Sequence, residues 1–124
     1  IEKTASDDET KIRLHEGTSK FKKICVTNSI RQTALLMLEK TGQLSFMEHV
    51  ISNEDVCNPK PDPEGYLKAI QYLQLQPNEC MIVEDAPKGI EAAKKSNAHV
   101  YEVKGYHDVT LENVLNTINH FNMN

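Results

Sequence analysis

The chain has 124 residues, a length that fits one compact domain. Hydrophobic residues make up 39% and charged residues 26%, as in ordinary soluble globular proteins, and the formal net charge is −4. No basic stripe interleaves with aromatic residues, and the longest apolar runs are too short to cross a bilayer. We therefore expect neither nucleic acid nor a membrane as a partner.

The cysteines indicate a reducing compartment. Cys25, Cys57 and Cys80 are odd in number and their spacing fits no zinc motif. We expect reduced thiols and a cytoplasmic protein. The chain begins at Ile1 and not at a methionine, so a processed or truncated start is also expected.

Residues 1–23 are polar and poorly periodic. They contain the acidic run Asp7-Asp8-Glu9 and a weak strand-like alternation at Ile12-Arg13-Leu14. We predict that this segment is mobile or only locally ordered.

From Ile24 onward, short apolar runs alternate with helical patterns. The apolar runs predict strands, and the patterns between and after them predict helices, at residues 24–26, 29–40, 50–51, a helix from 62, 81–83, 87–96, 100–103 and 111–121. This alternation predicts a parallel sheet in a three-layer α/β/α sandwich, with residues 24–124 as its domain. Ligands in such folds bind at the carboxyl ends of the strands.

Two of these helices carry particular expectations. The helix that begins at Asp62-Pro63 has a capping residue followed by a proline in its first turn. Asn97 suits the C-terminal end of the helix over 87–96. The side chains that we expect the first of these helices to bury are Tyr66, Leu67, Ile70 and Leu73.

Polar residues follow the first strand directly. Thr27, Asn28 and Ser29 place a hydroxyl and backbone N–H groups where a helix opens, which makes a small anion cradle. The same residues are also favoured as helix N-caps, and taken alone the capping interpretation is the better one.

The second candidate site is the loop Asn58-Pro59-Lys60-Pro61-Asp62-Pro63. Prolines on both sides of Lys60 stiffen its backbone and lower the entropy lost in holding the cation at one point. A fixed ammonium can neutralise a phosphoryl group, whereas an isolated lysine is usually a solvated loop residue. The flanking prolines favour the functional interpretation.

The third candidate site is Glu84-Asp85, at the end of the third strand. Adjacent carboxylates repel each other unless a cation or hydrogen-bond donors satisfy them, and hard oxygen ligands suit Mg²⁺. The alternative is that they stabilise the start of the next helix through its dipole. Of the two, we favour a metal site.

Together these segments resemble a known family. The succession TNS, NPKPDPEGYLKA and MIVEDAPKGIEAA resembles motifs two to four of haloacid-dehalogenase-type phosphatases, especially the β-phosphoglucomutase-like and phosphoglycolate-phosphatase-like members. The resemblance covers about residues 24–108 and implies a Rossmann-type core. It implies that Thr27 and Asn28 bind the transferring phosphoryl group, that Lys60 with Thr27 serves catalysis, and that Asp85 with Glu84 holds Mg²⁺.

The chain departs from this family at its N-terminal side. The family places a nucleophilic Asp in a DxDxT- or DxDxV-type motif at the end of its first apolar strand. Asp7 and Asp8 do not supply it, because residues 2–6 cannot form a buried strand. The helical cap of this branch is also absent, apart from a remnant within residues 1–16.

In the family, the missing strand lies between the strands that end at Thr27 and Glu84. Its absence leaves two rows of unpaired backbone groups. A neighbouring chain could supply the strand, or the two halves could close on each other. Our prediction is that Ile12-Arg13-Leu14 fills the gap.

We therefore expect a Mg²⁺-dependent phosphatase or phosphomutase of a small phosphorylated metabolite, inactive as this chain alone because covalent phosphoryl transfer needs the Asp nucleophile. The alternative is a non-catalytic α/β domain that binds phosphate or a protein partner. A receiver-like or flavodoxin-like domain is more distant, because neither explains the Lys60 loop together with Glu84-Asp85.

Overall fold

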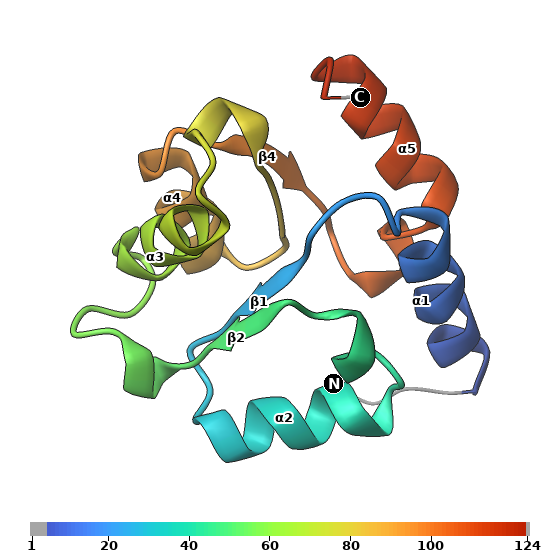
Figure 1. The fold of residues 1–124 in the computed structure, drawn as a ribbon, viewed down its shortest axis with the longest axis horizontal. Helices are drawn as coiled ribbons and strands as arrows, with labels where there is room; N and C mark the ends of the chain where they lie inside the picture. Colours follow the sequence, from blue (N-terminus) through green and yellow to red (C-terminus); the bar gives the residue numbers. More distant parts are fainter. Residues whose placement is uncertain (1–4, 124) are drawn as a thin grey trace.

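In the part of the chain that the structure describes, four short strands follow one another, with a helix between each strand and the next (Figure 1). The computed structural model describes residues 5–123. The strands are β1 (Ile24–Val26), β2 (His49–Ile51), β3 (Met81–Glu84) and β4 (His99–Glu102). The α-helices are α1 (Ala5–Gly17), α2 (Arg31–Lys40), α3 (Glu64–Leu73), α4 (Pro87–Lys95) and α5 (Leu111–His120). Each predicted strand and each helix predicted after Ile24 is present, with its ends shifted by at most a few residues.

The sheet is divided into two halves. β1 pairs in parallel with β2, Cys25 lying opposite Val50, and β3 pairs in parallel with β4, Ile82 lying opposite Val100. The two pairs form separate two-stranded sheets, so β1 and β3 are not paired with each other. This division is what the absence of a central strand predicts.

The inner edges of β1 and β3 carry backbone groups that do not pair with a neighbouring strand. The N–H of Thr27 donates to Ile51 O over 2.9 Å, and the N–H of Val103 donates to Glu84 O over 3.0 Å. Because backbone groups alternate in direction along a strand, the groups directed away from the paired neighbours belong to the intervening residues. These are Ile24 and Val26 of β1 and Met81 and Val83 of β3.

Alternating side chains of the strands pack against two layers of helices. Val26, Ile82 and Val100 contact the cluster formed with Tyr66 of α3 and Ala92 of α4. The side chains on the opposite face pack against α2 and α5: Cys25 lies with Ala34 and Leu38, and Met81 and Tyr101 lie with Val114 and Ile118. The three-layer α/β/α arrangement and its incomplete parallel sheet are thus confirmed. In Figure 1, α3 and α4 lie together on one side of β1 and β2, and α1 and α5 lie together on the other.

The expectation for the N-terminal segment was wrong in one respect. Ile12-Arg13-Leu14 does not form a strand in the gap but belongs to helix α1. Leu14 packs against Val114 and Ile118 of α5, away from the gap. The buried positions follow helical spacing, and most of them are polar: Lys11, Leu14, His15 and Thr18. The acidic residues Asp7 and Asp8 lie in the first turn of α1, and their side chains are outside the described residues.

Helix α4 spans nearly its predicted range, whereas the predicted start of α3 is wrong, since Pro63 and not Asp62 takes the N-cap position and makes no side-chain capping bond. Tyr66 and Ile70 are buried as expected, whereas Leu67 is exposed and Ala69 is buried in its place. Asn97 adopts the left-handed conformation just after α4, with a φ of 67°. Among the residues that the structure describes, no helix combines the length and the apolar character needed to cross a bilayer.

Candidate functional site

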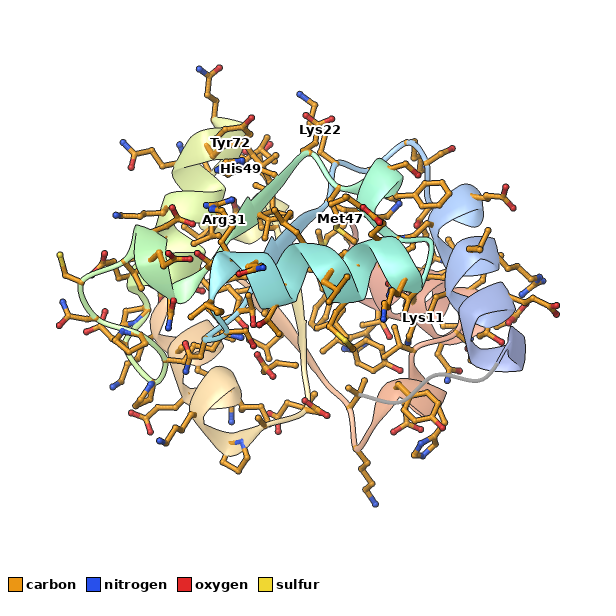
Figure 2. All side chains as sticks on the ribbon, turned by 90° about the horizontal axis from the view of Figure 1, so that it is seen from below. Lys11, Lys22, Arg31, Met47, His49 and Tyr72 are labelled. Atoms are coloured by element: carbon orange, nitrogen blue, oxygen red, sulfur yellow. The ribbon has the colours of Figure 1, made fainter. Side chains whose placement is uncertain are left out.

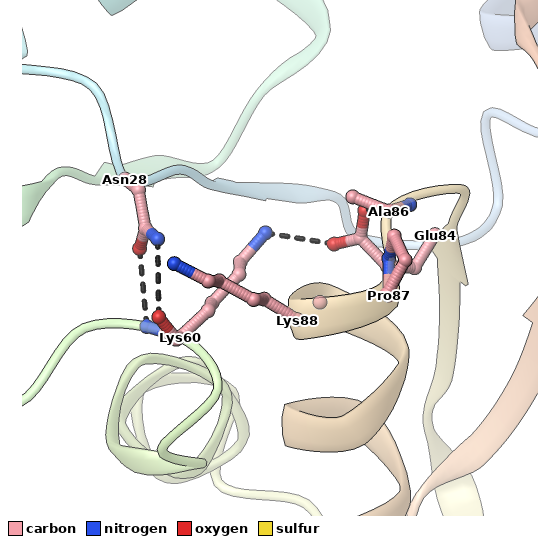
Figure 3. Close-up of a pocket in the computed structure, with 7 residues that line it drawn as sticks. Asn28, Lys60, Glu84, Ala86, Pro87 and Lys88 are labelled. Carbon is pink, nitrogen blue, oxygen red and sulfur yellow. Dashed lines mark hydrogen bonds and ion pairs between the residues drawn. The ribbon is translucent and has the colours of Figure 1, made fainter.

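Residues from three segments meet at the carboxyl edge of the divided sheet (Figure 3). Asn28 follows β1, Lys60 lies in the loop before α3, and Glu84 ends β3. They line a cavity of about 470 Å³, completed by the first turn of α4. That volume lies within the range of small-ligand sites. Of the predicted residues, Asn28, Lys60 and Glu84 therefore meet in one place, whereas Thr27 and Asp85 are next to them in the chain but do not line the cavity.

The backbone of Lys60 is fixed by the side chain of Asn28. Asn28 Oδ1 accepts a hydrogen bond from the Lys60 N–H over 3.1 Å, and Asn28 Nδ2 donates to Lys60 O over 3.3 Å. The peptide bond between Lys60 and Pro61 is cis. Asn28 thus ties the end of β1 to the lysine loop, and its Nδ2 retains a second N–H for a ligand.

The ammonium of Lys60 lies against the carboxylate of Glu84. Lys60 Nζ donates to Glu84 Oε2 over 2.8 Å, and only 15% of the Lys60 side chain and 10% of the Glu84 side chain are exposed. A second donor, the hydroxyl of Tyr66, reaches the same oxygen over 2.6 Å. The ion pair is therefore buried at the wall of the cavity.

Lys60 and Tyr66 determine the protonation state of Glu84. Burial acts to raise the pKa of the Glu84 carboxyl, but the hydrogen bonds from Lys60 and Tyr66 outweigh it, so the pKa lies below its ordinary value. Burial and the bond to the Glu84 carboxylate raise the pKa of Tyr66, which therefore remains a hydrogen-bond donor. Glu84 is thus held as a carboxylate.

Both oxygens of Glu84 are occupied. The second, Oε1, accepts from the backbone N–H groups of Asp85 and Ala86 over 3.1 and 3.2 Å. Glu84 can therefore bind a metal directly only by giving up one of these bonds. Among the described residues, none donates a hydrogen bond to the exposed carboxylate of Asp85, which is free to bind a cation.

The close approach of Glu84 to α4 requires a glycine. A Cβ placed on Gly89 would lie 2.0 Å from Glu84 Cδ and 2.1 Å from Glu84 Oε2. Gly89, in the first turn of α4, leaves the space in which the carboxylate sits. The sequence element EDAPKG therefore both supplies the acid and makes room for it.

Thr27 has a local partner. Its Oγ1 accepts a hydrogen bond from the Ser29 N–H over 3.1 Å. The N-cap position of α2 is Ile30, which makes no side-chain capping bond. The alternative interpretation of this segment as a helix N-cap is therefore wrong, and Thr27 instead closes a short turn at the end of β1.

Sequence reasoning missed Lys88. This exposed lysine lines the cavity from the first turn of α4, and among the described residues it has no hydrogen-bond or ion-pair partner. Figure 3 shows its side chain extending across the cavity toward Asn28. A lysine in the first turn of a helix is unfavourable because of the helix dipole. Its presence there was the sequence signal that could have marked Lys88 as a functional residue. Because Lys60 is paired with Glu84, Lys88 is the cation lining the cavity that is not paired.

The sequence profile of the haloacid dehalogenase-like hydrolases matches residues 10–103. The chain belongs to this family. It is 37% identical over 83 residues to validoxylamine A 7'-phosphate phosphatase of Streptomyces hygroscopicus subsp. limoneus, a match that covers 67% of this chain and 39% of that protein. It is also 35% identical over 81 residues to hexitol phosphatase A of Escherichia coli, a match that covers 65% of this chain and 38% of that protein.

Solved structures share the fold. The β-phosphoglucomutase of Clostridium difficile matches with a TM-score of 0.69 and 22% identity, over 92% of this chain and 56% of that chain. A hydrolase from Streptococcus pneumoniae matches with a TM-score of 0.72 and 22% identity, over 87% of this chain and 56% of that chain. The chain thus spans about two fifths of the length of these curated relatives and little more than half of these solved chains.

Phosphatases of this family generally use Mg²⁺. Among the side chains that the structure describes, no three of His, Cys, Asp or Glu are grouped so that they could hold a metal ion. The carboxylate of Asp85, next to the cavity, is free, whereas both oxygens of Glu84 already accept hydrogen bonds. The described residues therefore fit one part of a magnesium shell and not a complete site.

Proposed function

We propose that this chain forms the phosphate-binding part of a Mg²⁺-dependent phosphatase or phosphomutase that acts on a small phosphorylated metabolite. The observation that carries the proposal is the buried ammonium of Lys60, held by Glu84 at the wall of a cavity at the strand ends. Two relatives are named as phosphatases of phosphorylated compounds, which supports the reaction class.

The proposed roles follow from the donors that remain free. Lys60 has three N–H groups and uses one on Glu84, so two are available to a phosphoryl oxygen. Asn28 adds a donor from the cavity wall, Thr27 next to it retains its hydroxyl proton for a phosphoryl oxygen, and Asp85 contributes an oxygen to Mg²⁺. Bound Mg²⁺ would neutralise phosphoryl charge next to the cavity.

We infer that the chain alone is inactive. Of the described residues that line the cavity, Glu84 alone carries a carboxyl group, and its oxygens are occupied. Covalent phosphoryl transfer needs a carboxylate that can attack phosphorus. A complementing chain would supply it on a strand that enters between β1 and β3, where the free backbone groups of Val26 and Val83 would pair with it.

Two measurements test this proposal. Titration calorimetry should detect orthophosphate binding to the chain, weakened about tenfold or more by Lys60→Met, since a charged hydrogen-bonding group is lost. Hydrolysis of p-nitrophenyl phosphate with Mg²⁺ should be absent for the chain alone. It should appear when a peptide with an apolar strand followed by Asp-X-Asp is added. Equal phosphate affinity in the wild type and Lys60→Met would refute the site.

The alternative is a non-catalytic domain that binds phosphate or a protein partner. The saturated hydrogen bonding of Glu84 favours it, because the carboxylate then serves only to hold Lys60. Phosphate binding without turnover, even with the complementing peptide, would favour this alternative. The three cysteines are free thiols, which supports the proposal of a cytoplasmic location.

A further inference from the structure

Tyr66 lies beneath the Lys60–Glu84 ion pair and contacts both of its members. Its hydroxyl donates to Glu84 Oε2 over 2.6 Å, the same oxygen that accepts from Lys60 Nζ over 2.8 Å. Lys60 Nζ also lies 5.0 Å from the centroid of the Tyr66 ring. The side chain therefore offers the ammonium a π face and the carboxylate a proton donor.

The position of Tyr66 is itself fixed. It lies in the first turns of α3, is 6% exposed, and packs with Ile82 of β3 and Ala92 and Ala93 of α4. A rigid aromatic residue of this kind loses little entropy when it holds another group. The ammonium of a free lysine, in contrast, moves on a flexible four-carbon stem. Contact with Tyr66 and Glu84 removes much of that freedom from Lys60.

We propose that Tyr66 is a positioning residue of the phosphate site: through its hydroxyl on Glu84 and its ring below Lys60, it holds the ammonium at the cavity wall. This proposal rests on the proposed function, in which Lys60 contacts a phosphoryl group. Tyr66 does not line the cavity, so it acts on the anion only through Lys60 and Glu84.

Lys60 and Tyr66 donate to the same oxygen atom, Glu84 Oε2. Without the hydroxyl, Glu84 Oε2 keeps Lys60 as its donor but loses the second of its two hydrogen bonds. Oε1 stays bonded to the backbone N–H groups of Asp85 and Ala86, but Oε2 is held less firmly, and the ammonium that it binds is less ordered. Phosphate binding would have to restore that order, so the affinity falls although no contact with the anion is removed.

Tyr66→Phe is the informative variant, because it keeps the ring and removes only the hydroxyl. Tyr72→Phe is its matched control. Tyr72 lies on the same helix but is 52% exposed and does not line the cavity, and its ring stacks on His49 with 4.5 Å between centroids (Figure 2). Calorimetry with orthophosphate and urea unfolding are measured for both variants.

We expect Tyr66→Phe to weaken orthophosphate binding about tenfold, as loss of a hydrogen bond to a charged group can, and Tyr72→Phe to change it less than about twofold. A purely structural role would lower the urea midpoint of Tyr66→Phe and leave the affinity of the folded protein unchanged, and that result would overturn the proposal. If the wild type does not bind orthophosphate, or if Lys60→Met does not weaken its binding, the result would instead count against the proposed function.

A measurement on the wild type covers the case in which Tyr66→Phe does not fold. Nitrogen-15 relaxation of the lysine ammonium groups reports their mobility directly. We expect the Lys60 ammonium to be ordered and the unpaired ammonium of Lys88 to be mobile. Equal mobility of the two groups would overturn the inference that Lys60 is held in place, whether or not phosphate binds.

Discussion

Gly89 lies so close to Glu84 that no side chain fits between them: a Cβ on Gly89 would fall 2.0 Å from Glu84 Cδ. The helix α4 therefore begins against the carboxylate that holds Lys60. This contact links the packing of the helix on β3 to the position of the charged groups, and a change at Gly89 should affect both.

We predict that Gly89→Ala destabilises the fold by about 2–3 kcal/mol, since an overpacked site must shift the buried carboxylate and its partners. It should also weaken orthophosphate binding. Urea unfolding and calorimetry measure the two effects. Gly105→Ala is the control, because Gly105 has an extended backbone and its Cβ would only meet the exposed ring of His107, 3.1 Å away. Similar losses in both variants would contradict the role given to Gly89.

Lys88→Met should weaken orthophosphate binding several-fold, because it removes the unpaired cation that lines the cavity. Lys95→Met makes the same charge change on the same helix, but Lys95 lies at its other end and pairs with Glu91 over 2.7 Å. The control should therefore stay within about twofold of the wild type at the same salt concentration. An equal effect in the two variants would indicate that only net charge matters.

The Asp85 carboxylate should account for any binding of Mg²⁺. We expect weak binding in the millimolar range, because one carboxylate is only part of an oxygen shell. Asp85→Asn should abolish it, and Glu91→Gln, which changes the same charge on the exposed surface of α4, should not. Calorimetry with Mg²⁺ distinguishes these outcomes. Tight binding, or binding that survives Asp85→Asn, would show the assignment to be wrong.

His15 should make the docking of α1 sensitive to pH. Burial is the main cause that lowers the pKa of His15 below 6.5. Its Nε2 pairs with Gln43 over 3.0 Å, and its buried Nδ1 has no partner among the described residues. In the unfolded chain the histidine gains a proton near pH 6.5, whereas in the folded chain it gains the proton only at a lower pH. Stability is therefore complete above that pH and falls as the pH drops below it.

Urea unfolding at pH 7.5 and at pH 5.5 measures this effect, and His15→Gln supplies the control. The wild type should lose stability between the two values, and the variant should lose less. If the variant shows the same pH dependence, the effect comes from another group.

The free inner edges of the two half-sheets should be visible in hydrogen exchange. The amide of Thr27 is bonded to β2, whereas the amides of Val26 and Val83 are directed into the gap. We expect the latter two to exchange much faster than the amides of Cys25 and Ile82 in the same strands. Equal protection would mean that another segment pairs with these edges. Addition of the complementing peptide should slow the exchange of Val26 and Val83 specifically.

The strands could be predicted well from the sequence, because short apolar runs such as Met81–Val83, bounded by polar turns, are typical of buried strands in an alternating α/β chain. The sequence also predicted that Lys60 and Glu84 would meet, because both follow the carboxyl ends of strands. Helix α1 was missed because its buried face contains the polar residues Lys11 and His15, which a search for apolar periodicity does not reveal.

Tyr66 and Gly89 illustrate what periodicity leaves out of the site. Tyr66 was predicted as a core residue, and it is one, but a helical pattern does not say where its hydroxyl points. The same pattern does not show that a helix passes within contact distance of a carboxylate, which is the reason for Gly89. Side-chain partners across elements were therefore visible only in the structure.

The divided sheet also bears on cooperativity. In a continuous sheet, backbone hydrogen bonds couple every strand to the next, so that the domain melts as one unit. Here the ladder stops between β1 and β3, and the coupling depends on side chains such as Val26 packed against α3 and Lys60 bonded to Glu84. A probe on the β1–β2 half and a probe on the β3–β4 half should therefore report different midpoints on denaturation. A strand inserted between them would merge the two transitions into one.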